Sequence, residues 1–554
     1  MAHSQSSVHT DSSPETKDAA TESDVAEEAV LVYPKGFELA LIMIAISLTV
    51  FLVSLDTTIS ATAIPKITDQ FHSLNDIGWY GSAYMLTTAS FQLLFGRFYT
   101  HLNLKWVYLA AVVIFELGSL ICGVAPNSKA LIVGRAVAGL GASGLYTGSL
   151  IVIANTVPLE KRPMFNGLIN GLFGIASVVA PLLGGAFAEK STWRWCFYIN
   201  LPIGGLTILT VLFFFKPPKS AHKNTPEANS ASLFKRVAKY DPIGTAIFIP
   251  AIVCLLLALQ WGGSTYAWKS GHIIGLLVTC FVLLAAFVGV QFWAQENATV
   301  PPRILTYRSV VAGCIFSFCL GSANFVLVYF LPVWFQAIKN VSAIQSGINS
   351  LPMIIALAIS AIITGGLLAV VGYYTPFMIF SSTLMAVGAG LMTTFKASGT
   401  SSGKWIGFQV LFGFGFGAGM QQSMMAVQTV LDMKDVPTGV ALLMFIQTLG
   451  GALFVSVAQN VFTNRFVHGI IHDINNPDLS PSTILNAGAT SIRSVVPATL
   501  LGPVLEVYNS ALVAAFYVAA AMAALSMVGS LLMEWRSVKG KKKGEGGGEV
   551  AGGG

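Results

Sequence analysis

Charged side chains are scarce in this sequence. Only 10% of its 554 residues are Asp, Glu, Lys or Arg, whereas soluble proteins carry roughly a quarter. A chain so poor in charge cannot cover a water-facing surface of its own size, and one globular core is not expected at this length. The net charge of +6 is small and dispersed, so nucleic acid is not an expected partner. With 54% hydrophobic residues and a mean hydropathy of +0.71, the chain is predicted to have lipid as its solvent.

Several chemical signatures are also missing. The six cysteines form no CxxC pair and have no metal-ligand spacing, so neither a disulfide framework nor a metal site is expected. No Walker sequence is present, which argues against ATP as the energy source, and no cofactor is implied. A membrane-embedded enzyme would need clustered His, Asp or Cys, but the eight histidines are scattered. We interpret His468 and His472 as solvated loop residues.

Long apolar runs are what the sequence has instead. A membrane span needs about 20 mostly apolar residues to cross about 30 Å of hydrocarbon, and fourteen stretches meet this need. They predict an all-α polytopic membrane protein with spans at 38–60, 77–96, 104–124, 131–155, 165–187, 197–215, 241–261, 271–293, 310–336, 347–369, 374–395, 404–427, 438–460 and 509–533.

The distribution of basic residues orients these spans. An even number of spans places both termini on one side, and that side carries about twice as many Lys and Arg residues as the other. Both termini are therefore predicted to be cytoplasmic. Residues 1–37 are predicted to be a disordered tail, because they are rich in Ser, Thr, Asp and Glu. No cleavable signal peptide is expected, and the longest external loop is predicted at 462–508.

Three ionisable residues lie inside predicted spans, where a charge is costly and marks a candidate functional site. Glu116 and Arg135 are placed about 18 and 21 Å above the cytoplasmic face by the helical rise, so they are predicted to meet as an ion pair. This pair either carries protons or fixes span 3 to span 4. Asp56 has no evident basic partner, and it either carries a proton or caps the end of a helix.

Glycine and proline form a second pattern. Span 5 contains Pro181, Gly184 and Gly185 after three earlier glycines, and span 12 contains GFGFGAGMQQ. Small residues at this spacing let helices pack closely, and Pro181 removes one backbone hydrogen bond. Both sliding helices and tight static packing are compatible with this pattern.

The sequence resembles the major facilitator superfamily, and within it the fourteen-span drug:proton antiporter branch. The resemblance covers about residues 38–535 and rests on five segments, SLDTTISATAIPKI from 54, GRFYTHLNLKWVYL from 96, GRAVAGLGASG from 134, the Pro181 region of span 5 and WRWCFYINLPIG from 193. A later segment, FIQTLGGALFVSVAQN from 445, is similar to fungal members that export toxins and other secondary metabolites.

The resemblance implies a division of the chain into six, two and six spans. The expected parts are a first half (38–215), a cytoplasmic linker with two extra helices (216–309), a second half (310–535) and a cytoplasmic tail (536–554). It also places Asp56 and Arg135 on motif positions, and these two residues together with Glu116 are expected to couple protons. The resemblance further implies conformational gating by Gly96, Arg97, Lys105, Pro181, Gly184 and Gly185. The sequence departs from the loop 2–3 signature at Thr100, where an aspartate is usual, and at Asn103, where a glycine is usual.

The expected activity is proton-driven efflux of an amphipathic small molecule by a monomer in the plasma membrane, with the vacuolar membrane as the alternative location. Polar and aromatic residues of the second half are candidate cavity residues, although each could serve packing instead: Asn324, Trp334, Gln421, Gln422 and Gln447. A siderophore or basic-solute transporter of the same fold is the alternative function. Asn340 begins an external glycosylation sequon, whereas the sequon at Asn297 is expected to face the cytoplasm and stay unused.

Overall fold

A computed structural model describes residues 36–71, 76–215, 240–263, 266–474 and 492–539, together with the single positions 34, 476, 480, 481 and 484. Most of the predicted N-terminal tail, the linker at 216–239, much of the 462–508 loop and the last residues from 540 lie outside the described residues. Within the described part, the secondary structure is helical apart from two isolated backbone bridges.

The first half of the chain folds into helices that follow six of the predicted spans. Its helices are α1 (Phe37–Phe71), α2 (Ile77–His101), α3 (Leu104–Val124), α4 (Ser128–Thr156), α5 (Arg162–Lys190) and the consecutive pair α6 (Trp195–Tyr198) and α7 (Asn200–Phe214). Short polar turns separate them, and the asparagines at 103 and 127 accept hydrogen bonds from the free amides that begin α3 and α4. Helix α1 is longer than predicted, so Asp56 lies inside it and does not cap its end.

The remaining predicted spans also coincide with helices. The two extra spans are α10 (Pro242–Trp261) and α11 (Gly271–Ala294), followed by the short turns η2 (Gln295–Asn297) and η3 (Pro302–Thr306). The second half contains α12 (Arg308–Ala337), α13 (Ala343–Asn349), α14 (Leu351–Val371), α15 (Thr375–Met392), α16 (Ser402–Gly419), α17 (Gln422–Val430), α18 (Val436–His468), η4 (Gly469–Ile474), α20 (Ile492–Val495) and α21 (Leu501–Leu532).

Two boundaries of the last external loop were predicted wrongly. Helix α18 continues to His468 and passes into the π-helical turn η4, and α21 begins at Leu501. His468 and His472 therefore lie on consecutive helical turns, with ring centroids 4.3 Å apart, and not in an irregular loop. Eleven helical segments of the described chain are long and apolar enough to cross a membrane. Helices α2, α5 and α16 are not among them.

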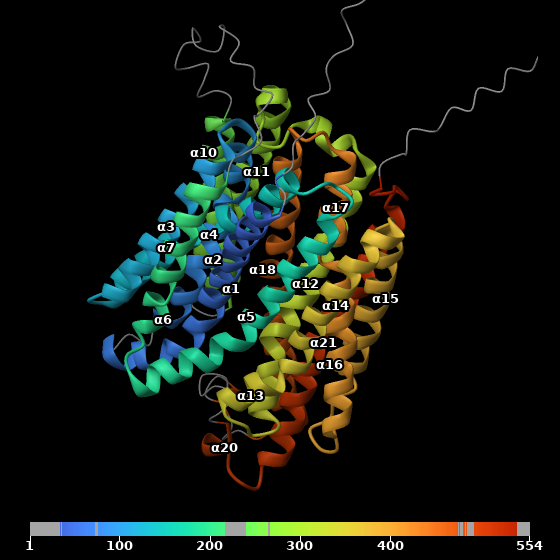
Figure 1. The fold of residues 1–554 in the computed structure, drawn as a ribbon. Helices are drawn as coiled ribbons and strands as arrows, with labels where there is room; N and C mark the ends of the chain where they lie inside the picture. Colours follow the sequence, from blue (N-terminus) through green and yellow to red (C-terminus); the bar gives the residue numbers. More distant parts are fainter. Residues whose placement is uncertain are drawn as a thin grey trace, which may run out of the picture.

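The helices form two bundles that lie side by side (Figure 1). In the first bundle α4 packs on α2 and α3, and α1 packs on α5; in the second, α12 packs on α18 and α21, and α16 packs on α14 and α15. The bundles meet where α2 contacts α18 and where α5 contacts α14. We call the end at which α1 begins and α21 ends the tail end, and the opposite end, which carries α13 and α20, the loop end (Figure 1).

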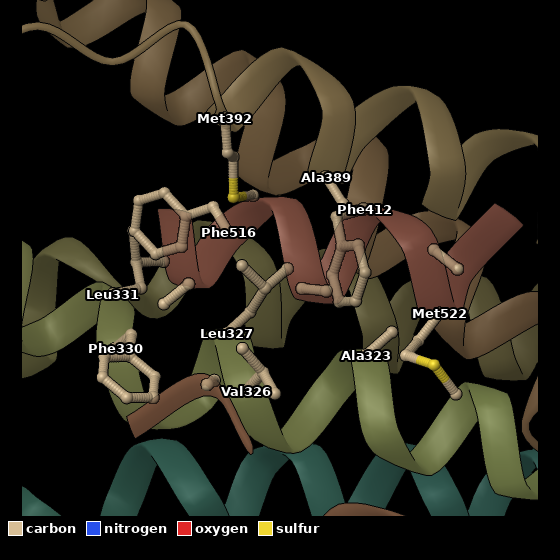
Figure 2. Packing of buried hydrophobic residues seen from close by; sticks show 14 of the residues in the cluster. Ala323, Val326, Leu327, Phe330, Leu331, Ala389, Met392, Phe412, Phe516 and Met522 are labelled. Atoms are coloured by element: carbon tan, nitrogen blue, oxygen red, sulfur yellow. The ribbon is translucent and has the colours of Figure 1, made fainter. Parts of the chain in front are cut away.

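The core of the second bundle is built from apolar side chains of α12, α15, α16 and α21. Figure 2 shows Leu327 and Leu331 of α12 directed towards Phe516 of α21 and Met392 of α15. All four side chains are completely buried. Because lipid tails are as apolar as these residues, close packing and not exclusion from water stabilises the contact.

The extra helices α10 and α11 lie at the edge of the contact between the bundles. Most of the surface of these two helices is not covered by other parts of the protein, as expected for helices that face lipid. Helix α10 is hydrogen-bonded to α2 through the Ser82 hydroxyl and Gln260 (2.8 Å), and Phe248 contacts Phe445 of α18 with ring centroids 5.1 Å apart. At the tail end, the Arg97 guanidinium donates to the Asn297 carbonyl in η2 (2.9 Å).

Candidate functional site

A buried ion pair joins α1 to α4 inside the first bundle. The Arg135 guanidinium donates to the Asp56 carboxylate at 2.6 Å, and the two side chains are 2% and 0% exposed. The predicted pairing of Arg135 with Glu116 is therefore wrong, as is the expectation that Asp56 lacks a basic partner. Arg135 lies inside α4, and its side chain is turned towards α1.

Further groups hold the pair in place. The Arg135 Nε donates to the Tyr80 carbonyl at 2.9 Å, and the guanidinium lies 4.4 Å from the centre of the Tyr84 ring. On the other side, the Asn200 amide donates to the second Asp56 oxygen at 3.3 Å. The charges are thus enclosed by a carbonyl, an aromatic face and an amide, which is how a buried ion pair is tolerated.

Sequence reasoning missed Asn200 although a signal was present. Asn200 begins α7 inside the WRWCFYINLPIG segment, and it is an amide within an otherwise apolar run. Its side chain is completely buried and also donates to the Ser119 hydroxyl on α3 at 3.0 Å. The residue therefore joins α1, α3 and α7 at one point, and the test applied to buried charges would have found it if it had included amides.

Glu116 lies beside this network without an ionic partner. Its side chain is 8% exposed, and neither carboxylate oxygen has a hydrogen-bond partner within the described residues. A Cβ added to Gly204 of α7 would come within 1.7 Å of a Glu116 oxygen, so the carboxyl packs directly on that glycine. Ser119 is one helical turn further along α3 and connects this position to Asn200.

The tail end of the interface between the bundles is closed. Gly96 of α2 packs so tightly on α18 that an added Cβ would lie 2.6 Å from the Ala441 methyl. Nearby, the Thr100 and Thr438 hydroxyls share a hydrogen bond of 3.2 Å. Thr100 occupies the position where the resemblance led us to expect an aspartate, so a neutral hydrogen bond forms the contact here.

The second contact between the bundles is equally close. A Cβ on Gly167 of α5 would lie 2.6 Å from the Ala361 carbonyl of α14, and Gly365 packs on the Pro163 carbonyl in the same way. Also at this end, the Arg162 guanidinium reaches the Met433 sulfur at 3.8 Å. The glycines of α5 therefore allow two helix backbones to touch near the tail end.

The other predicted gating residues have different surroundings. The Lys105 ammonium donates to the Leu212 carbonyl at 2.6 Å, which joins α3 to α7 within the first bundle. Pro181, Gly184 and Gly185 all lie in α5. The side-chain surroundings of Pro181 and Gly185 are outside the described part, so their gating role stays a prediction.

A charged clasp lies at the start of α18. The Arg303 guanidinium donates to both Asp435 oxygens at 2.7 and 2.8 Å and to Glu296 at 2.7 Å. Hydrogen bonding to Asp435 and Glu296 raises the pKa of Arg303 above its ordinary value, so this guanidinium stays charged at every physiological pH. It connects η2 and η3 to α18 at the tail end.

A cavity of about 290 Å³ lies between the bundles towards the loop end. Thr58 of α1 and Ser177 of α5 contribute to it from the first bundle. From the second bundle the lining residues are mostly apolar and come from α12, α13 and α14, namely Leu327, Val328, Leu331, Pro332, Ile344, Gly347, Ile348, Ser350, Leu351, Met353 and Ile354. The interface is thus closed at one end and hollow towards the other.

The candidate cavity residues do not gather in this space. Trp334 is completely buried in the second bundle, where its indole NH donates to Asn509 at 2.8 Å, so the structure places it in the core. Asn324 and Gln447 are half-buried on α12 and α18. Gln421 and Gln422 are buried where α16 passes into α17, and each keeps an amide oxygen that has no partner among the residues the structure describes.

The two glycosylation sequons lie at opposite ends of the bundle. Asn340 is exposed at the loop end, between α12 and α13, and has a left-handed backbone with φ of 54°. Asn297 is exposed in η2 at the tail end. Their separation agrees with the predicted arrangement, while their use stays a prediction.

Comparisons with known proteins add the following. The family model described as "Major Facilitator Superfamily" matches residues 46–455. The chain is 54% identical over 507 residues to the "MFS-type efflux pump MFS1" of Arthroderma benhamiae, covering 92% of this chain and 93% of the relative. It is 54% identical over 496 residues to the "Efflux pump roqT" of Penicillium rubens, covering 90% of each chain.

A solved structure shows the same fold. The human organic anion transporter MFSD10 (TETRAN) is similar with a TM-score of 0.55, covering 88% of this chain and 100% of that one. Its sequence identity is only 13%, so the likeness extends to the fold alone.

Proposed function

This chain belongs to the major facilitator superfamily, a family of transporters, and we propose that it exports an amphipathic small molecule in exchange for protons. Efflux is supported by relatives of about half-identical sequence that are named efflux pumps and match along nearly the whole chain. Helices of the described residues coincide with the fourteen predicted spans, which supports a fourteen-span protein, and we expect it to function as a monomer. On this basis the chain is a transporter and not an enzyme.

The excess of Lys and Arg around the tail end supports a cytoplasmic location for that end. We propose the plasma membrane as the location, with the vacuolar membrane as the alternative. The structure is then closed towards the cytoplasm and hollow towards the outside. We expect glycosylation at Asn340 and none at Asn297, measured by the gel shift that an endoglycosidase removes. Substituting each asparagine by Gln separately identifies the modified site. Modification of Asn297 instead would reverse the orientation.

The sealed Asp56–Arg135 pair is the observation on which proton coupling depends. An ion pair in hydrocarbon gains little stability over apolar residues of the same size, so its presence needs a functional reason. Protonation of Asp56 removes the charge that holds Arg135, so that the guanidinium keeps the Tyr80 carbonyl and the rings of Tyr84 and Phe197 but no negatively charged partner in the network described here. Such a change weakens the contact of α1 with α4, and it thereby couples proton binding to helix movement.

We include Glu116 as a second proton carrier. Its carboxyl is buried and unpartnered, and Ser119 and Asn200 connect its turn of α3 to Asp56. The Asn200 amide donates to both the Ser119 hydroxyl and the Asp56 carboxylate, so it aligns α3 with α1 but does not itself relay a proton. Glu116 therefore takes up and releases its proton separately from Asp56.

The test uses inside-out membrane vesicles with an acidic lumen and a fluorescent amphipathic dye. The wild-type protein should accumulate dye against its gradient, and collapse of the proton gradient should abolish accumulation. Asp56→Asn keeps the size of the side chain but cannot release a proton, so it should lose uphill transport while still exchanging dye across the membrane. Asp432→Asn, at a 71% exposed carboxylate, is the control. Uphill transport by Asp56→Asn would refute the coupling role.

A further inference from the structure

Four buried amide side chains lie on helices beside the tail-end half of the interface between the bundles. They are Gln92 of α2, Asn166 of α5, Gln421 at the start of α17 and Gln428 of α17, and none is more than 5% exposed. Within the described part of the chain, each keeps at least one amide atom without a hydrogen-bond partner, and both amide atoms of Gln428 lack one. We call these four residues the amide seam.

Direct contacts show that the amide seam spans the two bundles. The Asn166 amide donates across the interface to the Met425 sulfur of α17 at 3.5 Å. Gln421, Met425 and Gln428 follow one another at spacings of four and three residues, which places them on one face of the helix. The amide of Met425 accordingly donates to the Gln421 carbonyl at 3.0 Å, as in a continuous helical turn.

Gln92 is connected to the same interface through a neighbouring side chain. Its amide donates to the Thr147 hydroxyl of α4 at 3.1 Å. Thr147 in turn donates to the Met444 sulfur of α18 at 3.6 Å. These two hydrogen bonds across the interface therefore end on thioether sulfur, which is a weak acceptor. All four amide oxygens of the seam are left without a partner among the described residues.

Unsatisfied buried amides are costly, and each one in a native structure calls for an explanation. We propose that the amide seam binds the exported molecule when the tail end opens, and that this molecule is a neutral aromatic compound with several hydroxyl or NH donors. The inference rests on the proposed efflux function and adds the chemical class of the substrate. In the closed state the same amides are held apart from solvent and can bind nothing.

The chemistry of the amide seam selects this class. Its unpartnered atoms include an amide oxygen on each of the four residues, and amide oxygens accept hydrogen bonds from donors. The four side chains carry no formal charge, and Arg162 at the tail end of the same interface disfavours cations. The thioethers of Met425 and Met444 make favourable contacts with aromatic rings.

The loop-end cavity has the opposite character, because it is lined mainly by Leu, Ile, Val and Met. A molecule rich in hydrogen-bond donors therefore finds partners at the tail end and few at the loop end. We therefore expect the exported molecule to bind first at the amide seam and to leave through the apolar cavity.

The experiment compares two probes that differ only in donors. A neutral trihydroxyanthraquinone and its tri-O-methyl ether share the same ring system, and rhodamine 6G serves as an unrelated amphipathic cation. Uptake of each is measured in inside-out vesicles that contain the full-length protein. The variants Gln428→Met and Asn166→Leu replace an amide of the seam by an apolar side chain of similar size. Gln459→Met is the matched control, since Gln459 is exposed on α18 and donates only to Thr463.

We expect either seam variant to raise the KM for the trihydroxy probe by about two- to tenfold, the effect of one lost hydrogen bond. The KM for the tri-O-methyl ether should not change, and thermal stability should be maintained because an unsatisfied amide has been removed. Equal effects on both anthraquinones, or no effect on either, would overturn the inference. Wild-type transport of rhodamine 6G without the trihydroxy probe would also overturn it while leaving efflux intact. Transport of no probe at all would refute the proposed function itself.

Discussion

The contact of Gly96 with α18 gives a quantitative prediction about the closed tail end. A Cβ on Gly96 would lie 2.6 Å from the Ala441 methyl, whereas non-bonded carbon atoms are normally about 3.5 to 4.0 Å apart. Gly96→Ala therefore forces α2 and α18 apart by about 1 Å. Overpacking of this kind costs about 1 to 3 kcal/mol. Because only the closed state contains the contact, the equilibrium should shift towards the open tail end by about 5- to 150-fold.

The assay measures the separation of the bundles directly. Spin labels on Lys161→Cys and Lys434→Cys, in a background without the native cysteines, report the distance across the interface by electron double resonance. Both positions are exposed, and their neighbours Arg162 and Met433 touch across the interface. Gly96→Ala should increase the fraction of molecules in which the two spin labels are far apart. Gly81→Ala, on the same helix with no heavy atom within 4 Å, should not. Identical distance distributions for the two variants would refute the reasoning.

Two further substitutions test packing inside the bundles. Gly204→Ala should lower the melting temperature in detergent, because the new methyl group displaces the Glu116 carboxyl. Adding Glu116→Ala should restore the melting temperature. Gly205→Ala is the control, since a Cβ at Gly205 has no neighbour within 4 Å. Trp334→Phe should cost about 1 to 3 kcal/mol of stability, because it leaves the buried Asn509 oxygen unpaired, while the KM for export stays unchanged. A changed substrate preference at unchanged stability would instead place Trp334 in the cavity.

The positions of the helices were predictable from the sequence because the membrane restricts the choice. A segment in hydrocarbon must satisfy its backbone internally, so each apolar run of sufficient length became a helix. The ends were less predictable, since α1 and α18 continue beyond the apolar core and nothing in hydropathy marks where they end. The break between α6 and α7 likewise has no apolar signature.

The partners of the buried charges were not predictable in the same way. Depth follows from counting residues, and it placed Arg135 and Glu116 at similar heights. Pairing also depends on which face of each helix is turned inward, and helices that are apolar all round give little information about rotation. Arg135 therefore pairs with Asp56, while Glu116 packs on Gly204. Asn200 escaped notice because, in the first half of the chain, only formal charges were treated as exceptions to the apolar spans.

The attachment of the two extra helices has a mechanical consequence. They are hydrogen-bonded to α2 near both of its ends, through Gln260 of α10 at the loop end and through Asn297 of η2, which follows α11, at the tail end. Phe248 of α10 contacts Phe445 of α18 through ring packing, and the Arg303 clasp joins η2 to the start of α18. When the bundles separate at the tail end, α10 should therefore follow the first bundle, while η2 is bonded to both bundles and resists the separation. The two additional helices can in this way influence how readily the tail end opens.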